Sequence, residues 1–231
     1  MIFYFNMSIL TAKKVPTSFH SPSKLKSPKR RFFGRIKSMN KSKHTKKLLS
    51  EKTHPIIELF FEFAQLKNLY RQGWLDKGVS ELDCETVADH SFGVALLGYI
   101  IAEEYRQDLD SQKVMRLGLL HDLGEIYAGD ITPREDISSK DRFMKEYKAV
   151  QKVFSHLPNP EKYINLWLEV EREKTPEAKF VKQVDRLEMA LQANLYERMN
   201  YSNLDEFFLY VQGKVNFDEL KLILDNILKL R

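Results

Sequence analysis

The sequence lacks the features of a disulfide-stabilised, zinc-ribbon or membrane-spanning protein. Cys84 is the single cysteine, so the chain can form neither an intramolecular disulfide nor a paired-cysteine zinc site. No apolar run approaches the roughly 20 residues that a membrane-spanning helix needs. Residues 2–10 are apolar but short, and the basic residues follow them, whereas a secretory signal places its basic residues first.

Acidic residues are absent from the first 50 positions. This segment holds 13 Lys or Arg and no Asp or Glu, whereas the remaining 181 residues carry 24 basic and 32 acidic side chains. The overall charge of +5 therefore combines a basic leader with an acidic body of net charge −8. An acidic body argues against nucleic acid as its partner, because neutralising phosphates requires clustered Lys and Arg.

We predict that residues 1–50 form a disordered leader and that residues 51–231 form the folded domain. The leader is rich in Lys, Arg and Ser, a composition that buries too little apolar surface to fold alone. It is typical of an organellar transit peptide, but it also fits a disordered tail, a nucleic-acid-binding tail or an upstream start with Met39 as the true first residue. We expect the protein in the cytoplasm, or in a plastid or mitochondrion if the leader is a transit peptide.

Apolar residues recur at helical spacing through most of residues 55–230. No alternating stretch predicts a strand, so the predicted fold is an all-α bundle with mostly short polar loops. Thr86 or Asp89 is expected to cap the second helix. The pattern predicts helices over about 55–74, from 86 or 89, over 111–127, and then from about 138, 163, 176, 204 and 217.

Ionisable side chains lie on the apolar faces of three predicted helices. His90 lies on the second helix, the adjacent pair His121 and Asp122 on the third, and Asp185 on the helix that starts at residue 176. Taken alone, each is commonly a hydrogen-bonded core histidine or a surface carboxylate. Burying all four requires compensation, and helical bundles often build metal sites in their interior. Two imidazoles and two carboxylates suit Mn²⁺, Co²⁺, Fe²⁺, Zn²⁺ or, less well, Mg²⁺.

This ordered set resembles the motif of the HD-domain metal-dependent phosphohydrolases. The closer resemblance is to the 5′-deoxynucleotidase branch, which includes the eukaryotic HD domain-containing protein 2 group. It covers about residues 55–225 and leaves the leader unexplained. Five segments carry it: Arg71-Gln-Gly-Trp74, Glu85-Thr-Val-Ala-Asp89-His90-Ser91, His121-Asp122-Leu-Gly-Glu125, Gly129-Asp130-Ile-Thr-Pro133 and Ala178-Lys-Phe-Val-Lys182-Gln-Val-Asp185.

The resemblance implies an HD-domain helical bundle that hydrolyses deoxyribonucleoside 5′-monophosphates. It implies that His90, His121, Asp122 and Asp185 bind a divalent ion, with Mn, Co or Mg expected and Fe or Zn as further candidates. Glu125 matches the catalytic acid that orients or deprotonates the attacking water. The branch also implies a homodimer.

Five further residues take roles by the same resemblance. Asp130 matches a second acidic residue, which either assists protonation of the leaving 5′-oxygen or holds a loop. Arg71 matches the arginine that binds the phosphate, where a guanidinium bonds two oxygens at once. Trp74 matches a tryptophan near the sugar or base, although the bacterial branch places its Arg and Trp side by side and this chain separates them by two residues. Lys182 and Thr132 are weaker candidates for substrate contact.

Other functions remain open at this stage. Within the superfamily, the substrate could be a nucleoside triphosphate, a cyclic nucleotide or guanosine tetraphosphate. Outside enzymes, the chain could be a non-catalytic nucleotide-binding module that keeps the fold, or the basic leader could be an RNA or membrane-surface anchor. A body of 181 residues with Arg71 and Glu125 favours the monophosphatase among the hydrolases, and the intact metal ligands together with Glu125 argue against the non-catalytic module.

Overall fold

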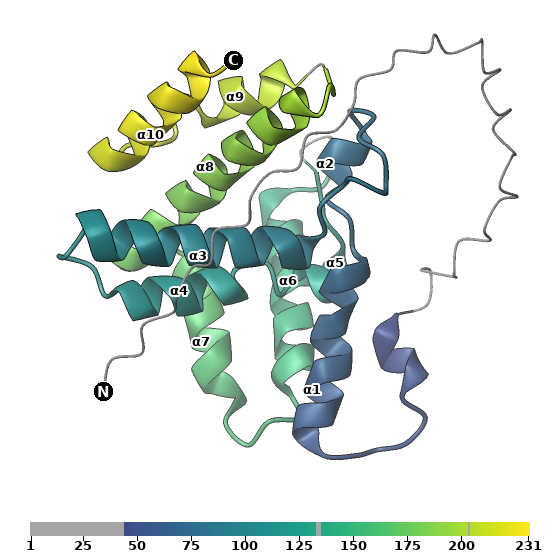
Figure 1. The fold of residues 1–231 in the computed structure, drawn as a ribbon. Coiled ribbons are helices and arrows are strands. Elements are labelled where there is room, and N and C mark those ends of the chain that lie inside the picture. The colour runs from purple at the N-terminus through teal and green to yellow at the C-terminus, as the bar shows by residue number, and fades with distance from the viewer. Residues whose placement is uncertain (1–43, 133–134, 203) are drawn as a thin grey trace, which may run out of the picture. The chain divides into compact units, whose positions relative to one another are not determined.

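The computed structural model describes residues 44–132, 135–202 and 204–231, and these residues confirm the predicted all-α class (Figure 1). Residues 1–43 of the predicted leader lie outside the described residues, and so does Pro133. Within the described residues the only β-type pairing is an isolated antiparallel bridge between Tyr70 and Thr86. None of their helices is both long enough and apolar enough to cross a bilayer.

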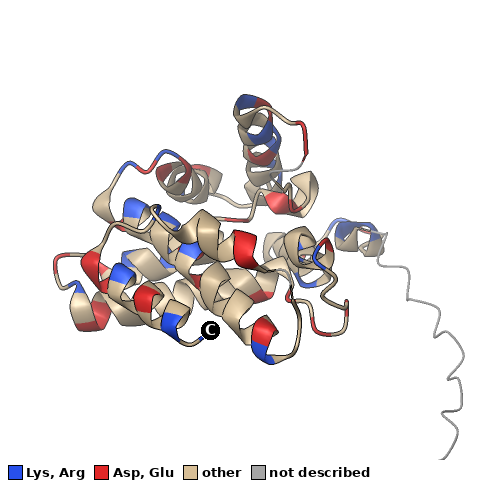
Figure 2. Cartoon of the chain, turned by 90° about the horizontal axis from the view of Figure 1, so that it is seen from above, with Lys and Arg blue, Asp and Glu red and all other residues tan. Residues whose placement is uncertain are grey.

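The helices follow one another in a bundle in which α3 packs against both α4 and α8 (Figure 1). Basic and acidic residues are interspersed over its helices rather than gathered into one basic face (Figure 2). In chain order the elements are η1 (Thr45–Leu48), α1 (Pro55–Phe63), η2 (Ala64–Asn68), α2 (Gln72–Leu75), α3 (Val87–Tyr105), α4 (Ser111–Leu120), α5 (Glu125–Ala128), α6 (Ser139–Phe154), α7 (Pro160–Glu171), α8 (Pro176–Arg198), α9 (Asp205–Val211) and α10 (Asp218–Lys229).

Helix α3 begins where the sequence predicted, because Thr86 and Asp89 form a reciprocal cap. The Thr86 hydroxyl accepts the Asp89 backbone N–H at 3.2 Å, and the Asp89 carboxylate accepts the Thr86 N–H at 2.9 Å. The cap satisfies two of the backbone donors that a helix start leaves free. It also fixes the first turn of α3, which carries His90.

Two helices that were predicted as continuous are broken. Helix α1 ends at Phe63 and tightens into the 3-10 helix η2, after which Tyr70 is extended and pairs with Thr86. Helix α4 ends at Leu120, and a turn precedes the short α5. The predictions of single helices over 55–74 and 111–127 are therefore wrong. Apolar spacing is similar in α and 3-10 segments, so periodicity alone does not locate such breaks.

Close packing holds the turn between α4 and α5 in place. A Cβ on Gly118 would lie 2.8 Å from the Ala95 Cα, and one on Gly124 would lie 2.6 Å from the Glu146 Cβ. Helices α3 and α6 therefore approach this stretch more closely than a side chain would allow. The fully buried Trp167 donates its indole N–H to the His121 carbonyl at 3.0 Å. His121 is thus held by backbone contacts on a rigid turn.

The packed part of the chain extends N-terminal to the boundary predicted at residue 50. The Thr45 hydroxyl donates to the Phe61 carbonyl at 2.6 Å, and the Thr45 N–H donates to Gln65 Oε1 at 3.0 Å. Residues 45–48, which the sequence analysis assigned to the leader, therefore pack on α1 and η2.

Candidate active site

Three elements bring the four predicted metal ligands together. His90 comes from α3, His121 and Asp122 from the end of α4, and Asp185 from α8. His90 Nε2 lies 3.2 Å from Asp185 Oδ1 and 3.6 Å from Asp122 Oδ2, and His121 Nε2 lies 3.2 Å from the same Asp122 oxygen. We call these four residues the HD cluster.

The donor atoms of the HD cluster fit a divalent ion. Both Nε2 atoms are buried and have no hydrogen-bond partner among the described residues. An ion about 2.1 Å from each donor sets neighbouring donors about 3.0–3.4 Å apart, close to the observed 3.2–3.6 Å. One ligand atom from each of His90, His121 and Asp122 lies within 4.8 Å of the other two, and Asp185 joins through its contact with His90.

The second nitrogen of each imidazole already has a partner. His121 Nδ1 lies 2.7 Å from the Gly118 carbonyl, and His90 Nδ1 lies 2.6 Å from Glu188 Oε2. A carbonyl oxygen only accepts, so His121 carries its proton on Nδ1 and directs the Nε2 lone pair at the cluster, as metal-binding histidines do. Burial opposes ionisation of Asp122, but when the imidazoles are protonated the charges of His121, His90 and Arg71 outweigh it and hold the pKa of this carboxyl well below its usual range.

Arg71 lies beside the HD cluster, immediately before α2. Its Nη1 lies 3.0 Å from Asp130 Oδ1 and 3.9 Å from Asp122 Oδ2. Burial alone would lower the pKa of Arg71, but Asp130, Glu125 and Asp122 raise it, so the guanidinium stays charged. The other Asp130 oxygen accepts the Gln72 backbone N–H. Asp130 therefore fixes both the guanidinium and the first turn of α2.

Glu125 is the first residue of α5 and lies within the same pocket as Arg71 and Asp122. Its side chain is 2% exposed, and its Oε2 has no hydrogen-bond partner among the described residues. Burial, followed by the charges of Asp122 and Asp130, raises the pKa of Glu125 well above its usual range. A carboxyl group in this environment is suited to exchanging a proton near neutral pH.

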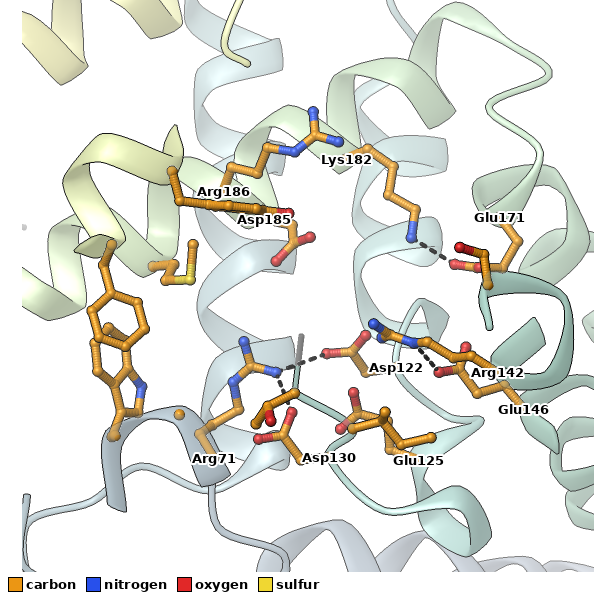
Figure 3. A pocket seen from close by; sticks show the side chains of 18 of the residues that line it. Arg71, Asp122, Glu125, Asp130, Arg142, Glu146, Glu171, Lys182, Asp185 and Arg186 are labelled. Carbon is orange, nitrogen blue, oxygen red and sulfur yellow. Dashed lines mark hydrogen bonds and ion pairs between the residues drawn. The ribbon is translucent and has the colours of Figure 1, made fainter. Parts of the chain in front are cut away.

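These groups line a cavity of about 700 Å³ (Figure 3). Arg71, Asp130 and Glu125 lie along one side of it, and Lys182, Asp185 and Arg186 lie along the facing side. The cavity is large enough for a nucleotide-sized molecule.

The remaining predicted contacts also line this cavity. Trp74 is 1% exposed, donates its indole N–H to Glu85 Oε1 at 2.7 Å, and packs at a tilt of 36° against Phe207, with ring centroids 4.0 Å apart. Lys182 Nζ lies 2.6 Å from Glu171 Oε1. The Thr132 N–H donates to Glu135 Oε1 at 3.2 Å, and Thr132 also faces the cavity. Eight of the ten predicted site residues thus line one pocket, and the other two, His90 and His121, contact its Asp122.

Sequence reasoning missed several charged residues of this pocket. Arg142 pairs with Glu146 at 2.7 Å on α6, and Arg186 follows Asp185 on α8. An Arg and a Glu four residues apart on a helix usually form a solvent-facing pair, so the pattern gave no signal of a pocket. Glu188, the partner of His90, was missed because a glutamate on a helix is usually solvent-exposed.

The fold and the site together define a helical domain with a candidate cation centre beneath a charged pocket. Comparison with known families assigns it: the HD domain model matches residues 63–223, and the chain belongs to the HD-domain family. A human protein named 5′-deoxynucleotidase HDDC2 is 34% identical over 161 residues, which cover 68% of this chain and 76% of the human one. A Dictyostelium discoideum protein of the same name is 34% identical over 185 residues, which cover 74% of this chain and 96% of the Dictyostelium one.

Solved structures share the fold. The crystal structure of a protein from Pyrococcus horikoshii superposes with a TM-score of 0.64 at 32% identity, covering 76% of this chain and 99% of that one. A predicted metal-dependent phosphohydrolase from Magnetospirillum magnetotacticum has a TM-score of 0.58 at 24% identity, covering 76% and 92%. The second likeness concerns the fold alone.

Proposed function

We propose that this protein is a metal-dependent 5′-deoxynucleotidase that hydrolyses deoxyribonucleoside 5′-monophosphates to deoxyribonucleoside and phosphate. The observation that carries the proposal is the HD cluster: its two buried Nε2 atoms make no hydrogen bond among the described residues, and its Asp122 and Asp185 line one pocket with Arg71 and Glu125. The names of the curated relatives support the substrate class.

In this proposal His90, His121, Asp122 and Asp185 hold the ion. When bound, a divalent ion supplies Lewis acidity towards a phosphoryl oxygen and favours ionisation of water. Two imidazoles and two carboxylates favour Mn²⁺ or Co²⁺ over Mg²⁺, with Fe²⁺ or Zn²⁺ as alternatives.

Arg71 binds the phosphate through two N–H donors. Glu125 exchanges a proton with the water that attacks phosphorus. Asp130 already bonds Arg71 and the Gln72 N–H, which supports the loop-holding role rather than a proton-donating one. We therefore assign Asp130 to positioning Arg71.

The sugar and base extend from the phosphate along the cavity. Trp74 borders this wall but is buried and bonded through its indole N–H to Glu85, so we assign it to shaping the wall. Lys182 is paired with Glu171, so its ammonium contributes positive charge near the phosphate while staying bound to that carboxylate. Thr132 lines the cavity and lies in the loop after α5.

We further propose a homodimer, and a cytoplasmic location unless the basic leader directs the protein to a plastid or mitochondrion. Light scattering after size-exclusion chromatography tests the dimer. Fluorescent fusions with and without residues 1–43 test the leader while keeping residues 45–48, which pack on α1 and η2; equal distribution of the two fusions would reject a targeting role.

The decisive assay compares deoxyribonucleoside and ribonucleoside monophosphates on metal-stripped protein, before and after Mn²⁺, Co²⁺, Mg²⁺ or Zn²⁺ is restored. We expect phosphate release from the deoxy substrates only after metal is added. Release of pyrophosphate or triphosphate from a triphosphate panel would assign a different HD hydrolase. Nucleotide binding without any hydrolysis would assign a non-catalytic module.

A further inference from the structure

His90 is held on both sides of its ring by carboxylates from one turn of α8. Asp185 Oδ1 lies 3.2 Å from its Nε2, and Glu188 Oε2 lies 2.6 Å from its Nδ1. Residues three apart on a helix face the same side, so a single helical turn contacts both nitrogens of the imidazole. Glu188 is only 6% exposed, and burying a carboxylate is costly unless it is hydrogen-bonded.

The space for the Glu188 carboxylate depends on a glycine in α3. A Cβ on Gly93 would lie 2.8 Å from Glu188 Oε1 and 3.2 Å from its Cγ. Glycine inside a helix costs about 1 kcal/mol relative to alanine, and the structure supplies a reason for it here. Without Cβ, Gly93 lets α8 place a carboxylate directly against the His90 ring.

Glu85 is a second carboxylate close to His90. One ligand atom from each of Glu85, His90 and Glu188 lies within 4.8 Å of the other two. Glu85 Oε1, however, accepts the Trp74 indole N–H at 2.7 Å. Among the described residues, Glu188 alone hydrogen-bonds His90 Nδ1.

The two histidines of the HD cluster therefore differ in their outer contacts. His121 Nδ1 bonds a backbone carbonyl, whereas His90 Nδ1 bonds a side-chain carboxylate. A carboxylate behind a metal-binding imidazole fixes its tautomer and increases its basicity as a ligand. Of the two imidazoles, His90 is the one whose metal affinity can be changed by substituting a side chain.

We propose that Glu188 is the positioning residue for His90, fixing the Nδ1–H tautomer so that Nε2 faces the HD cluster, and that Gly93 provides the space this contact requires. The inference rests on the metal centre of the proposed function. It adds the residue that fixes the tautomer and orientation of His90. It does not depend on which phosphoester is hydrolysed.

The test measures Co²⁺ binding to metal-stripped protein by calorimetry and by the visible absorption spectrum of the bound ion. We expect Glu188→Ala to weaken Co²⁺ binding by about 10–100-fold and to change the spectrum of the saturated protein. Glu188→Gln should lose less, because it keeps an oxygen of similar position. Gly93→Ala should weaken binding while every donor is still present.

Glu197→Gln is the matched control, because Glu197 lies on the same helix and pairs with Arg231 at 2.6 Å, away from the HD cluster. It should bind Co²⁺ as the wild type does. Wild-type affinity and spectrum in Glu188→Gln and Gly93→Ala would overturn the proposal, even if Glu188→Ala fails to fold. So would a bound ion seated on the Nδ1 side of His90, between Glu85 and Glu188.

Hydrolysis assays separate this inference from the proposed function. If the wild type binds Co²⁺ but hydrolyses no nucleotide, the function fails while the affinity series still tests Glu188. If the wild type hydrolyses nucleotides and the Glu188 variants bind Co²⁺ normally, the positioning role fails alone.

Discussion

Two partly buried clusters of carboxylate and histidine side chains lie in different parts of this molecule. One is the HD cluster. The other, which we call the α1 cluster, consists of Lys46, Glu58, Glu62 and His156. In it, Lys46 Nζ lies 3.0 Å from Glu58 Oε2 and 3.7 Å from Glu62 Oε1, and His156 Nδ1 lies 3.0 Å from Glu58 Oε2.

The two clusters differ in the source of positive charge at their centre. The α1 cluster receives an ammonium from its own chain, and the Tyr127 hydroxyl donates to Glu62 as well. In the HD cluster the nearest cation is Arg71, which reaches Asp122 only at 3.9 Å, and the Nε2 atoms of both histidines face carboxylate oxygens at 3.2–3.6 Å. Buried carboxylates must be paired. The comparison indicates that the α1 cluster serves folding, whereas the HD cluster is arranged to receive an external ion.

The largest effect is expected from Asp122→Ala, because Asp122 Oδ2 lies within 3.6 Å of the Nε2 atoms of both His90 and His121. The variant should lose bound metal and nucleotide hydrolysis together. Glu62→Gln in the α1 cluster is the counterpart and should retain both. Metal content by mass spectrometry and phosphate release measure the two effects. Metal retained in Asp122→Ala would show that the HD cluster does not bind the metal through Asp122 and would contradict the proposed difference between the clusters.

Glu125→Gln should separate chemistry from metal binding. Glu125 lines the pocket but is not one of the four candidate ligands, so metal content should be unchanged. Loss of a general acid or base typically costs about 10²–10⁴-fold, and we expect kcat to fall within that range. Single-turnover kinetics with saturating metal give this number, and unchanged turnover would remove Glu125 from the mechanism.

Arg71→Ala should act mainly on substrate binding. Hydrogen bonds to charged groups are worth about 1.5–3 kcal/mol, so kcat/KM should fall by roughly 10–100-fold. Inhibition by inorganic phosphate should weaken in parallel. Arg116→Ala removes an exposed arginine that lies near Asp110, and it should leave both constants unchanged; equal losses in the two variants would mean that Arg71 contributes charge alone.

Lys46→Met should have the smallest effect and should alter stability rather than metal binding. It leaves Glu58 and Glu62 without their ammonium, which costs less than breaking a fully buried pair because Lys46 is 25% exposed. We expect a loss of about 1–2 kcal/mol in the free energy of unfolding. Urea denaturation measures it, and a drop in Co²⁺ affinity instead would show that the α1 cluster is not independent of the site.

The candidate metal ligands and the start of α3 could be predicted from the sequence. His90, His121, Asp122 and Asp185 were predictable because each lies on or beside an apolar stripe, where an ionisable side chain is conspicuous. The Thr86 cap was predictable from local chemistry. The turn before Glu125 was not, because it depends on Gly124 meeting Glu146 of α6.

Glu188 and Arg142 were unpredictable for a related reason. A glutamate or an arginine on a helix is usually solvent-exposed, and nothing in the local spacing marks these two. Their significance comes from what other helices place opposite them: His90 and Gly93 for Glu188, and the pocket for Arg142.

Anomalous diffraction from crystals grown with Mn²⁺ tests most directly whether the HD cluster binds a divalent ion. The account predicts one strong anomalous peak within about 2.0–2.3 Å of His90 Nε2, His121 Nε2, Asp122 and Asp185, and none at the α1 cluster. A peak at Glu58 and Glu62, or no peak near the two Nε2 atoms at saturating Mn²⁺, would contradict it.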